Sequence, residues 1–234
     1  MKRFILSRGG DVLQSHRATR ANAQVRDEIL YYCRESVRAG LNFNTQGNIS
    51  VRLDGSDAIV ITPSGVRYDL MTPDDLVVVD PDGRVLEGTL LPSTELPVHL
   101  AHYRRRPDVQ AIVHTESTFV NVLGVLGRQI DPVLLNMVLY AKGPVPVMPF
   151  EFSTHAEFGR RSADLMGDAV NAVHWANHGL LAVGTSLELA FKGGRRGRGE
   201  RRGASPREPR RCAERPRLRP DRGPGGRPPA LSRA

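Results

Sequence analysis

The chain has 234 residues, enough for one sizeable domain, and its 40% hydrophobic content is ordinary for a globular protein. It lacks the roughly eighteen-residue apolar run of a membrane span, and its basic start has too short an apolar stretch for a signal peptide. Cys33 and Cys212 are the only cysteines, which speaks against a disulfide framework and predicts a cytoplasmic protein.

The net charge of +8 and the isoelectric point near 10.2 suggest a nucleic-acid binder, but the charge is unevenly distributed. Residues 193–234 hold fourteen arginines and four acids, which is a net charge of +10 and leaves −2 for residues 1–192. The body of the chain is therefore mildly acidic, and binding of nucleic acid is not expected from it.

The first 23 residues have no clear apolar period, and we expect a loose arm there. A domain is predicted over residues 24–192, beginning with a helix whose apolar residues recur at helical spacing up to Gly40. Later helices are predicted in 94–107, 117–127, 155–168 and 186–192. Strands are predicted in 45–53, 57–65, 109–117, 171–179 and 180–184, with a hairpin in 75–88 and a proline-broken edge segment in 144–150.

Residues 193–234 change character, because Gly, Pro, Arg and Ala make up 33 of the 42 residues. So few apolar residues cannot offset the entropy lost on folding, so this tail is predicted to be disordered. These four residue types have codons built only from G and C, so a shifted reading frame is the favoured explanation. A genuine disordered tail is the alternative, and an RNA-binding tail is disfavoured because no Tyr, Phe or Trp is present to stack on bases.

Three polar turns are candidate anion sites: Asn44–Asn48 before a strand, Thr62–Gly65 after the next strand, and Pro92–Glu95 before a helix. Backbone N–H groups point outward at such turns, and a helix dipole can assist. Each turn alone is equally well explained as a helix cap or a plain β-turn.

Two histidines and one carboxylate are candidates for a metal site. His114 and Glu116 are two residues apart in a predicted strand, so their side chains would share a face, and His178 follows in a turn. Such a set can hold Zn²⁺ or another divalent ion, although a strand Glu and a turn His are more often unrelated. The other histidines considered have no convincing partner in the sequence: His99, His102, His155 and His174.

Four segments, "GLNFNTQGNISVR", "ITPSGVRYDLMTPDDLVVVD", "LPSTELPVHLAHYRRRPDVQAIVHT" and "ANHGLLAVG", resemble the class II aldolase/adducin family, closest to its L-fuculose-1-phosphate aldolases. The resemblance covers about Val25 to Phe191. It implies an α/β fold in three α/β/α layers around a mostly antiparallel sheet. It also implies a homotetramer with an active site near a subunit boundary.

The resemblance also implies roles for single residues. Glu95 matches the catalytic carboxylate, while His114 and His178 match two metal-binding histidines. The three turns match one substrate phosphate site. Its residues here are Thr45, Gly47, Asn48, Ser64, Gly65, Ser93 and Thr94.

Two features depart from the family pattern. Glu116 stands where the family has the second histidine of a His-x-His pair. A carboxylate can still bind Zn²⁺, and a His/Glu/His set would also suit Fe²⁺ or Mn²⁺. The second departure is the tail, which lacks the tyrosine that aldolases of this family carry near the C-terminus.

The function that the resemblance implies is aldol cleavage of a ketose phosphate to an aldehyde and dihydroxyacetone phosphate. The alternatives within the family are a sugar-phosphate 4-epimerase, a decarboxylase, and a non-catalytic adducin-like or degenerate chain. A sugar phosphate is the expected small-molecule partner, and the N-terminal arm and the tail have no assigned role.

Overall fold

The computed structural model describes residues 9–194, so residues 1–8 of the predicted arm and residues 195–234 of the predicted tail lie outside the described part of the chain. The elements in chain order are α1 (Gly9–Arg38), β1 (Asn48–Arg52), β2 (Ile59–Ile61), the 3₁₀ helix η1 (Pro73–Asp75), β3 (Val77–Val79), β4 (Val85–Glu87), α2 (Leu96–Arg105), β5 (Ala111–Thr115), α3 (Thr118–Val125), α4 (Leu135–Tyr140), β6 (Val147–Met148), α5 (Ala156–Met166), β7 (Ala172–Trp175), β8 (Gly179–Gly184) and α6 (Leu187–Gly194).

The eight strands form one sheet in the order β4-β3-β2-β1-β5-β8-β7-β6. All neighbouring strands pair antiparallel except β6 and β7, which are parallel. The proline-broken segment provides β6 at the edge of the sheet, where a missing N–H costs no ladder hydrogen bond. The mixed α/β fold with a largely antiparallel sheet, which the sequence predicted, is confirmed.

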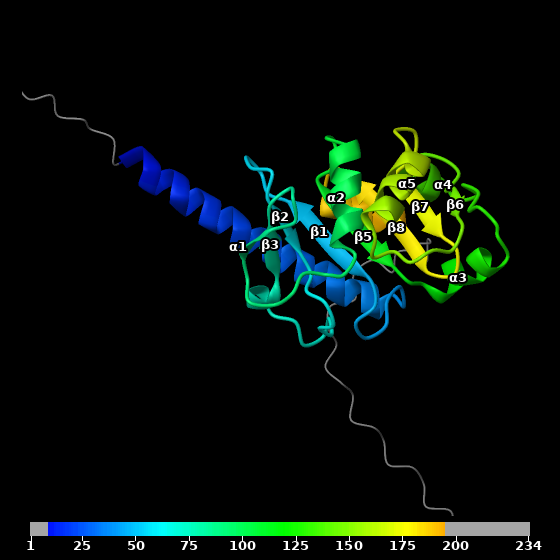
Figure 1. The fold of residues 1–234 in the computed structure, drawn as a ribbon, viewed down its shortest axis with the longest axis horizontal. Helices are drawn as coiled ribbons and strands as arrows, with labels where there is room; N and C mark the ends of the chain where they lie inside the picture. The colour runs from blue at the N-terminus through cyan, green and yellow to red at the C-terminus, as the bar shows by residue number, and fades with distance from the viewer. Residues whose placement is uncertain (1–8, 195–234) are drawn as a thin grey trace, which may run out of the picture. The chain divides into compact units, whose positions relative to one another are not determined.

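Both faces of the sheet are covered by helices (Figure 1). Ile59 and Ile61 of β2 pack in a core with residues of α2 and α5, whereas Val60 packs in a second core with residues of α1 and α6. Successive side chains of a strand point to opposite faces, so a short run of apolar residues can serve both cores. The result is the expected layering, with a pair of helices on each side of the sheet.

The N-terminal arm differs from its prediction, because α1 begins at Gly9 and not near residue 24. The sequence from Asp11 to Ala39 contains no glycine or proline, so nothing in it interrupts a helix. Residues 9–23 lack an apolar stripe, and apolar periodicity therefore could not reveal them as helical.

Most other elements lie where the sequence placed them. The hairpin β3–β4 turns at Gly83, whose φ of +84° favours glycine, and α2 ends shortly before Pro107. Helix α4 was not predicted. It lies on a third, smaller core together with α3, and this segment leaves many apolar side chains exposed.

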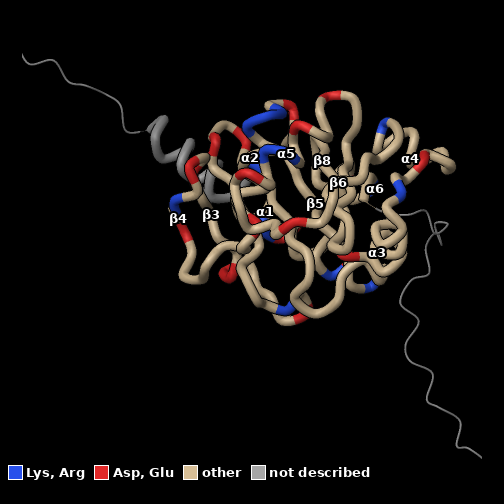
Figure 2. Tube along the Cα trace, turned by 45° about the vertical axis from the view of Figure 1, so that its right-hand side comes forward, with Lys and Arg blue, Asp and Glu red and all other residues tan. Residues whose placement is uncertain are grey.

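None of the helices in residues 9–194 combines the length and the apolarity that a membrane crossing requires. Basic and acidic residues are both spread along the described part of the chain (Figure 2).

Candidate metal and anion site

Strand β5 and the turn between β7 and β8 bring two histidines together. His114 lies in β5 and is completely buried, and β5 pairs with β8 so that His114 is opposite Leu181. His178 lies in the turn that precedes β8, where its backbone N–H donates to Trp175 O at 3.1 Å. Gly179 permits this approach, because a Cβ there would lie 2.9 Å from His114 Cε1 and closer still to a Thr115 backbone atom.

Glu95 stands at the N-terminal end of α2 and is 6% exposed. Its carboxylate lies between the two histidines: Oε2 is 3.4 Å from His114 Nε2, and Oε1 is 3.2 Å from His178 Nε2. Each of the three residues offers one ligand atom, and these atoms lie within 4.8 Å of one another. Among the described residues they form the one cluster of at least three His, Cys, Asp or Glu side chains that could hold a metal ion.

The carboxylate of Glu95 is held ionised. Burial acts to raise its pKa, but the neighbouring His114 and His178 and the amide of Asn48 outweigh burial, and the pKa lies below its ordinary value. Asn48 Nδ2 donates to Oε2 at 2.7 Å, and Ser153 Oγ donates to Oε1. Because Glu95 holds its charge here, it attracts cations.

The ring of His114 has one nitrogen that is free to bind a cation. Its Nδ1 is 3.1 Å from the carbonyl oxygen of Leu180, and a carbonyl can only accept, so Nδ1 carries the hydrogen. Nε2 is then an unprotonated lone pair, and it is buried with no hydrogen-bond partner. Burial also lowers the pKa of His114, against the opposing charge of Glu95.

A lone pair that faces a carboxylate is unfavourable unless a cation lies between them. The donor set of two imidazoles and one carboxylate suits Zn²⁺ and related divalent ions, so the residues present fit a metal centre. For His178, burial acts to lower the pKa, but the hydrogen bond and charge of Glu95 outweigh it and raise the pKa. A bound ion would have to displace that proton.

Glu116 lies beside this cluster and outside it. Strand β5 ends at Thr115, so Glu116 is the first residue after the strand and not a strand neighbour of His114 as predicted. Its Oε1 accepts from the backbone N–H of Gly47 at 3.1 Å and is 3.9 Å from His114 Nε2. Its own N–H donates to Oδ1 of Asn42, two residues before the first polar turn, at 2.9 Å.

The three polar turns are neighbours in space. Backbone bonds join the second turn to the third, since Ser64 N–H donates to Leu91 O and Ser93 N–H donates to Thr62 O, each at 3.0 Å. The backbone N–H of Ile49, next to the first turn, donates to Thr62 Oγ1 at 3.2 Å. Among the predicted anion-site residues, Asn48 and Ser93 are buried, Gly47 is half-buried, and the others are exposed: Thr45, Ser64, Gly65 and Thr94.

The first turn depends on glycine at position 47. Gly47 has a φ of +72°, and a Cβ there would lie 2.5 Å from both Asn42 Nδ2 and the backbone oxygen of His114. The turn is therefore pressed against β5, and its N–H faces Glu116. This close contact places the first polar turn directly beside His114 and Glu116.

Sequence reasoning missed two residues that contact Glu95 or its neighbours. Ser153, in the loop before α5, gave no sequence signal. His99 was judged to have no convincing partner, and this was wrong: its Nε2 is 2.5 Å from Asn48 Oδ1, and its Nδ1 is 2.6 Å from Ser50 Oγ. The spacing of His99 one helical turn after Glu95 is the signal that could have identified it.

The remaining histidines lie elsewhere. His102 was also judged to lack a partner, but its Nε2 is 3.1 Å from Ser162 Oγ of α5. His174 in β7 is buried, and neither ring nitrogen has a hydrogen-bond partner among the described residues. His155 is exposed at the start of α5.

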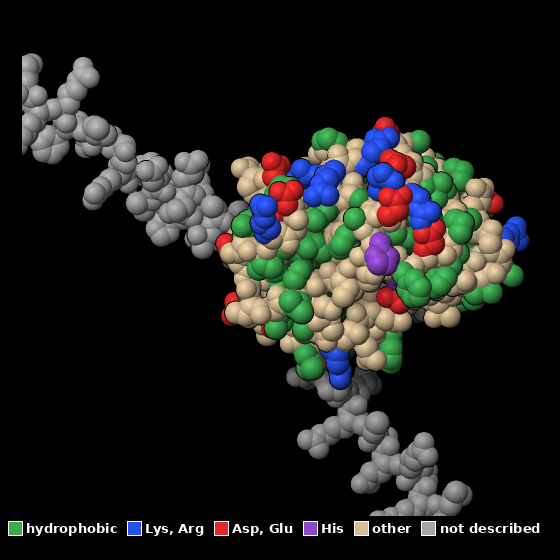
Figure 3. Space-filling view, in the orientation of Figure 1, with side chains coloured by type: hydrophobic (Ala, Val, Ile, Leu, Met, Phe, Trp, Pro, Cys, Tyr) green, Lys and Arg blue, Asp and Glu red, His purple; other side chains and the backbone are tan. Residues whose placement is uncertain are grey.

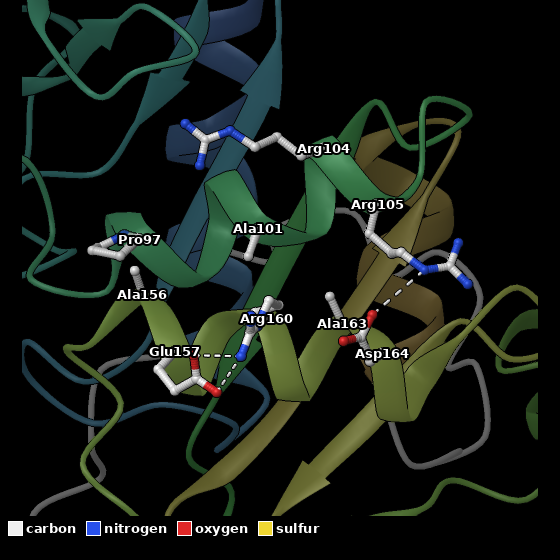
Figure 4. A pocket seen from close by; sticks show the side chains of 9 residues that line it. All are labelled: Pro97, Ala101, Arg104, Arg105, Ala156, Glu157, Arg160, Ala163 and Asp164. Atoms are coloured by element: carbon white, nitrogen blue, oxygen red, sulfur yellow. Dashed lines mark hydrogen bonds and ion pairs between the residues drawn. The ribbon is translucent and has the colours of Figure 1, made fainter.

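A cavity of about 510 Å³ between α2 and α5 contains none of the predicted site residues (Figure 4). Its three arginines already contact oxygens: Arg160 pairs with Glu157, Arg105 with Asp164 and Asp168, and Arg104 with the Pro81 carbonyl. On this face of the molecule, basic and acidic side chains lie next to one another (Figure 3). We therefore do not place the anion site there.

The comparisons with known proteins identify the family. The family model described as "Class II Aldolase and Adducin N-terminal domain" matches residues 27–193. The 5-deoxy-D-ribulose 1-phosphate aldolase of Bacillus thuringiensis serovar kurstaki is 35% identical over 166 residues, which is 71% of this chain and 77% of that protein. The L-fuculose phosphate aldolase of Escherichia coli K12 is also 35% identical, over 70% of this chain and 74% of its own length.

Solved structures identify the same family. A structure of L-fuculose 1-phosphate aldolase is 33% identical with a TM-score of 0.68, covering 73% of this chain and 79% of the other. The L-fuculose-1-phosphate aldolase from Thermus thermophilus is 29% identical with a TM-score of 0.62, covering 74% and 86%. The fold, the matched residues and the relatives together show that this chain belongs to the class II aldolase and adducin family.

Proposed function

We propose that this chain is a metal-dependent aldolase that cleaves a ketose phosphate to an aldehyde and dihydroxyacetone phosphate. The observation that carries the proposal is the convergence of Glu95, His114 and His178 beside three adjoining polar turns. A cation site and an anion site next to one another suit a substrate that carries both a phosphate and a carbonyl group.

His114 and His178 would hold the ion, with Glu95 offering a carboxylate oxygen to the same centre. Glu116 is a further proposed ligand, because its Oε1 already lies 3.9 Å from His114 Nε2. Zn²⁺ suits these ligands, and Mn²⁺ or Fe²⁺ would also do so if Glu116 takes part. When bound, the ion would supply Lewis-acid polarisation of the substrate's oxygens.

Glu95 is the proposed proton carrier. Its carboxylate is buried, ionised and oriented by two hydrogen bonds, so it is positioned to accept a proton from a substrate hydroxyl brought next to it. The proposed role of Glu95 therefore combines a ligand oxygen for the ion with proton transfer to or from the substrate.

The three turns are the proposed phosphate site. The turns offer the hydroxyls of the exposed residues Thr45, Ser64 and Thr94 and also backbone N–H groups, among them that of Gly47. Together these groups can replace the water around a phosphate. Because Glu116 accepts the Gly47 N–H, phosphate binding at this N–H would require Glu116 to release it.

The test is an aldol cleavage assay on the full chain reconstituted with Zn²⁺, Mn²⁺ or Fe²⁺. L-fuculose 1-phosphate and 5-deoxyribulose 1-phosphate are the first substrates to assay, because the relatives' names identify them. Release of dihydroxyacetone phosphate, lost in Glu95→Gln, would support the proposal. An inverted pentulose phosphate, or loss of carbon dioxide from a sugar acid assayed in parallel, would replace it with an epimerase or a decarboxylase. No turnover in a folded, metal-loaded chain would refute catalysis.

We also propose that the chain assembles as a homo-oligomer, with the family's tetramer as the expected form. Exposed apolar side chains gather between residues 119 and 139, including Phe119 at 64%, Val133 at 81% and Leu135 at 72% exposure. Such a surface is larger than isolated apolar residues explain, and it is typical of an interface. A cytoplasmic location stays a prediction.

A further inference from the structure

Behind Glu95, a chain of buried polar side chains extends toward the far end of α2. Tyr103 OH lies 2.9 Å from Ser50 Oγ, which lies 2.6 Å from His99 Nδ1. His99 Nε2 lies 2.5 Å from Asn48 Oδ1, and Asn48 Nδ2 lies 2.7 Å from Glu95 Oε2. None of these five residues is more than 7% exposed, so the chain is shielded from water.

The direction of every hydrogen bond in this series can be deduced from the orientation of the Asn48 amide. Asn48 presents its NH₂ group to Glu95 Oε2 and its oxygen to His99 Nε2. An amide oxygen can only accept, so the hydrogen of the His99 ring is on Nε2. Neutral His99 has one ring hydrogen, and burial agrees with neutrality because it lowers the pKa of His99 to about 3.

The donors of the remaining two hydrogen bonds follow from the position of the hydrogen on Nε2 of His99. With Nε2 protonated, Nδ1 of His99 is an acceptor and takes the hydroxyl hydrogen of Ser50. The hydroxyl of Ser50 has no second hydrogen, so Tyr103 must donate to it. All four hydrogen bonds therefore have assigned donors, and reversing any one of them would leave two donors or two acceptors facing each other in a buried place.

We propose that His99, Ser50 and Tyr103 are positioning residues, which hold the Asn48 amide so that its NH₂ group faces Glu95 and keeps this carboxylate directed at the metal and substrate site. This inference rests on the proposed function, since it concerns how Glu95 is oriented for it. None of the three touches the cluster of ligand atoms, so they act through Asn48.

The spacing of Glu95, His99 and Tyr103 explains how the single helix α2 positions three members of the hydrogen-bond series. Glu95 caps the helix, and His99 and Tyr103 follow at intervals of four residues, so all three face the same side, toward β1. Strand β1 supplies Asn48 and Ser50, which are two residues apart and therefore share the face that meets α2. The packing of α2 against β1 thus brings together all five residues of the hydrogen-bond series.

The first measurement is the tautomer of His99, read from long-range ¹H–¹⁵N correlations of the full chain labelled on histidine. We expect a hydrogen on Nε2, and we expect Ser50→Ala and Tyr103→Phe to shift the Nδ1 resonance while the tautomer is kept. A hydrogen on Nδ1 would overturn the inference. This reading needs neither bound metal nor turnover, so it stands apart from the proposed function.

The second measurement is the affinity for Zn²⁺ alone, by titration calorimetry. Loss of such supporting hydrogen bonds typically weakens metal binding about 10–100-fold, which we expect for His99→Leu. His99→Gln should recover most of the affinity, because its amide can donate to Asn48 and accept from Ser50. The matched control is His102→Gln, an equally buried histidine on the same helix that contacts Ser162 instead. We expect it to change affinity by less than about threefold.

The outcomes separate the two proposals. Equal Zn²⁺ affinity in wild type and a folded His99→Leu variant, or a His99→Gln variant no better than His99→Leu, would refute the positioning role. If His99→Leu does not fold, the milder Ser50→Ala and Tyr103→Phe variants take its place. A chain that shows the expected tautomer and affinities but cleaves no ketose phosphate would refute the proposed function and leave the positioning role intact.

Discussion

The site around Glu95 and the segment formed by α3 and α4 differ in the kind of side chain that they bury and the kind that they expose. Around Glu95, polar side chains are buried, and nearly every one has a partner of the right kind. The conspicuous exception is Nε2 of His114, which faces the carboxylate. On α3 and α4, apolar side chains such as Phe119 and Leu135 are exposed with no cover among the described residues.

This contrast indicates which kind of binding partner from outside the fold each region suits. A buried polar group without a partner indicates a missing cation or ligand, because leaving it bare is costly. An exposed apolar surface indicates a missing protein surface, because water does not favour it. The first region is thus suited to a metal ion, and the second to another protein surface.

The largest expected effect tests the buried region. His114→Ala removes the orphan lone pair, and we expect Zn²⁺ affinity to fall at least about 100-fold and aldol cleavage to be lost with it. Titration calorimetry on protein shown to be folded by circular dichroism measures this. His155→Ala, at an exposed position, is the matched control and should bind as wild type does. Undiminished affinity in His114→Ala would place the ion elsewhere.

A second test addresses the tight contact that joins the first turn to β5. Gly47→Ala would place a methyl group 2.5 Å from two neighbouring atoms at a φ of +72°, and we expect a loss of roughly 3 kcal/mol in the free energy of unfolding. Gly40→Ala is the control, because Gly40 has a φ of +67° with open space around it and should lose only about 1 kcal/mol. Equal losses in denaturant melts would show that the contact has no energetic importance.

The buried histidines predict a pH dependence of stability. Burial lowers the pKa of both His99 and His102 to about 3, against 6.5 ordinarily. Between pH 6.5 and 3 the unfolded chain therefore binds protons that the folded chain does not, so stability falls as the pH falls. The two groups together contribute a slope of roughly 3 kcal/mol per pH unit in this window.

His102→Gln isolates one of these groups. Its removal should reduce the slope by about 1.4 kcal/mol per pH unit relative to wild type, with no change above pH 6.5. Urea melts between pH 7 and pH 4 measure the difference, and the comparison with wild type cancels the contributions of the acidic side chains. Parallel curves for the two proteins would show that His102 is not held neutral.

The smallest effect on folding is expected on the apolar surface. Val133→Glu combined with Leu135→Glu should change the free energy of unfolding of the single chain by no more than about 0.5 kcal/mol for each, since both side chains are exposed. The mass in solution should nevertheless fall toward that of one chain, which sedimentation velocity would show. The same two substitutions at Val85 and Leu86, which are exposed on β4, should leave the mass unchanged. An unchanged mass in the surface variant would contradict the proposed interface.

Much of the fold was accessible from the sequence because its signals are local. The strand Ile59–Ile61 and the helix Leu96–Arg105 carry the apolar patterns of elements that pack on a sheet, and proline or glycine marks their ends. Glu95, His114 and His178 were identified through motifs at family spacing, and the structure brings them together. The early start of α1 escaped prediction because residues 9–23 show no apolar stripe.

What the sequence by itself determined was the set of reactive side chains, the order of the elements and the uneven charge, because residue type and spacing carry these directly. Only the tertiary structure decided their partners. Whether Glu116 turns to the Gly47 N–H or to His114, and which face of α2 holds His99 against Asn48, depends on how β1, β5 and α2 pack together. Hydrogen bonds and ligand sets join residues far apart in the chain, so their geometry exists only after the sheet and helices have packed.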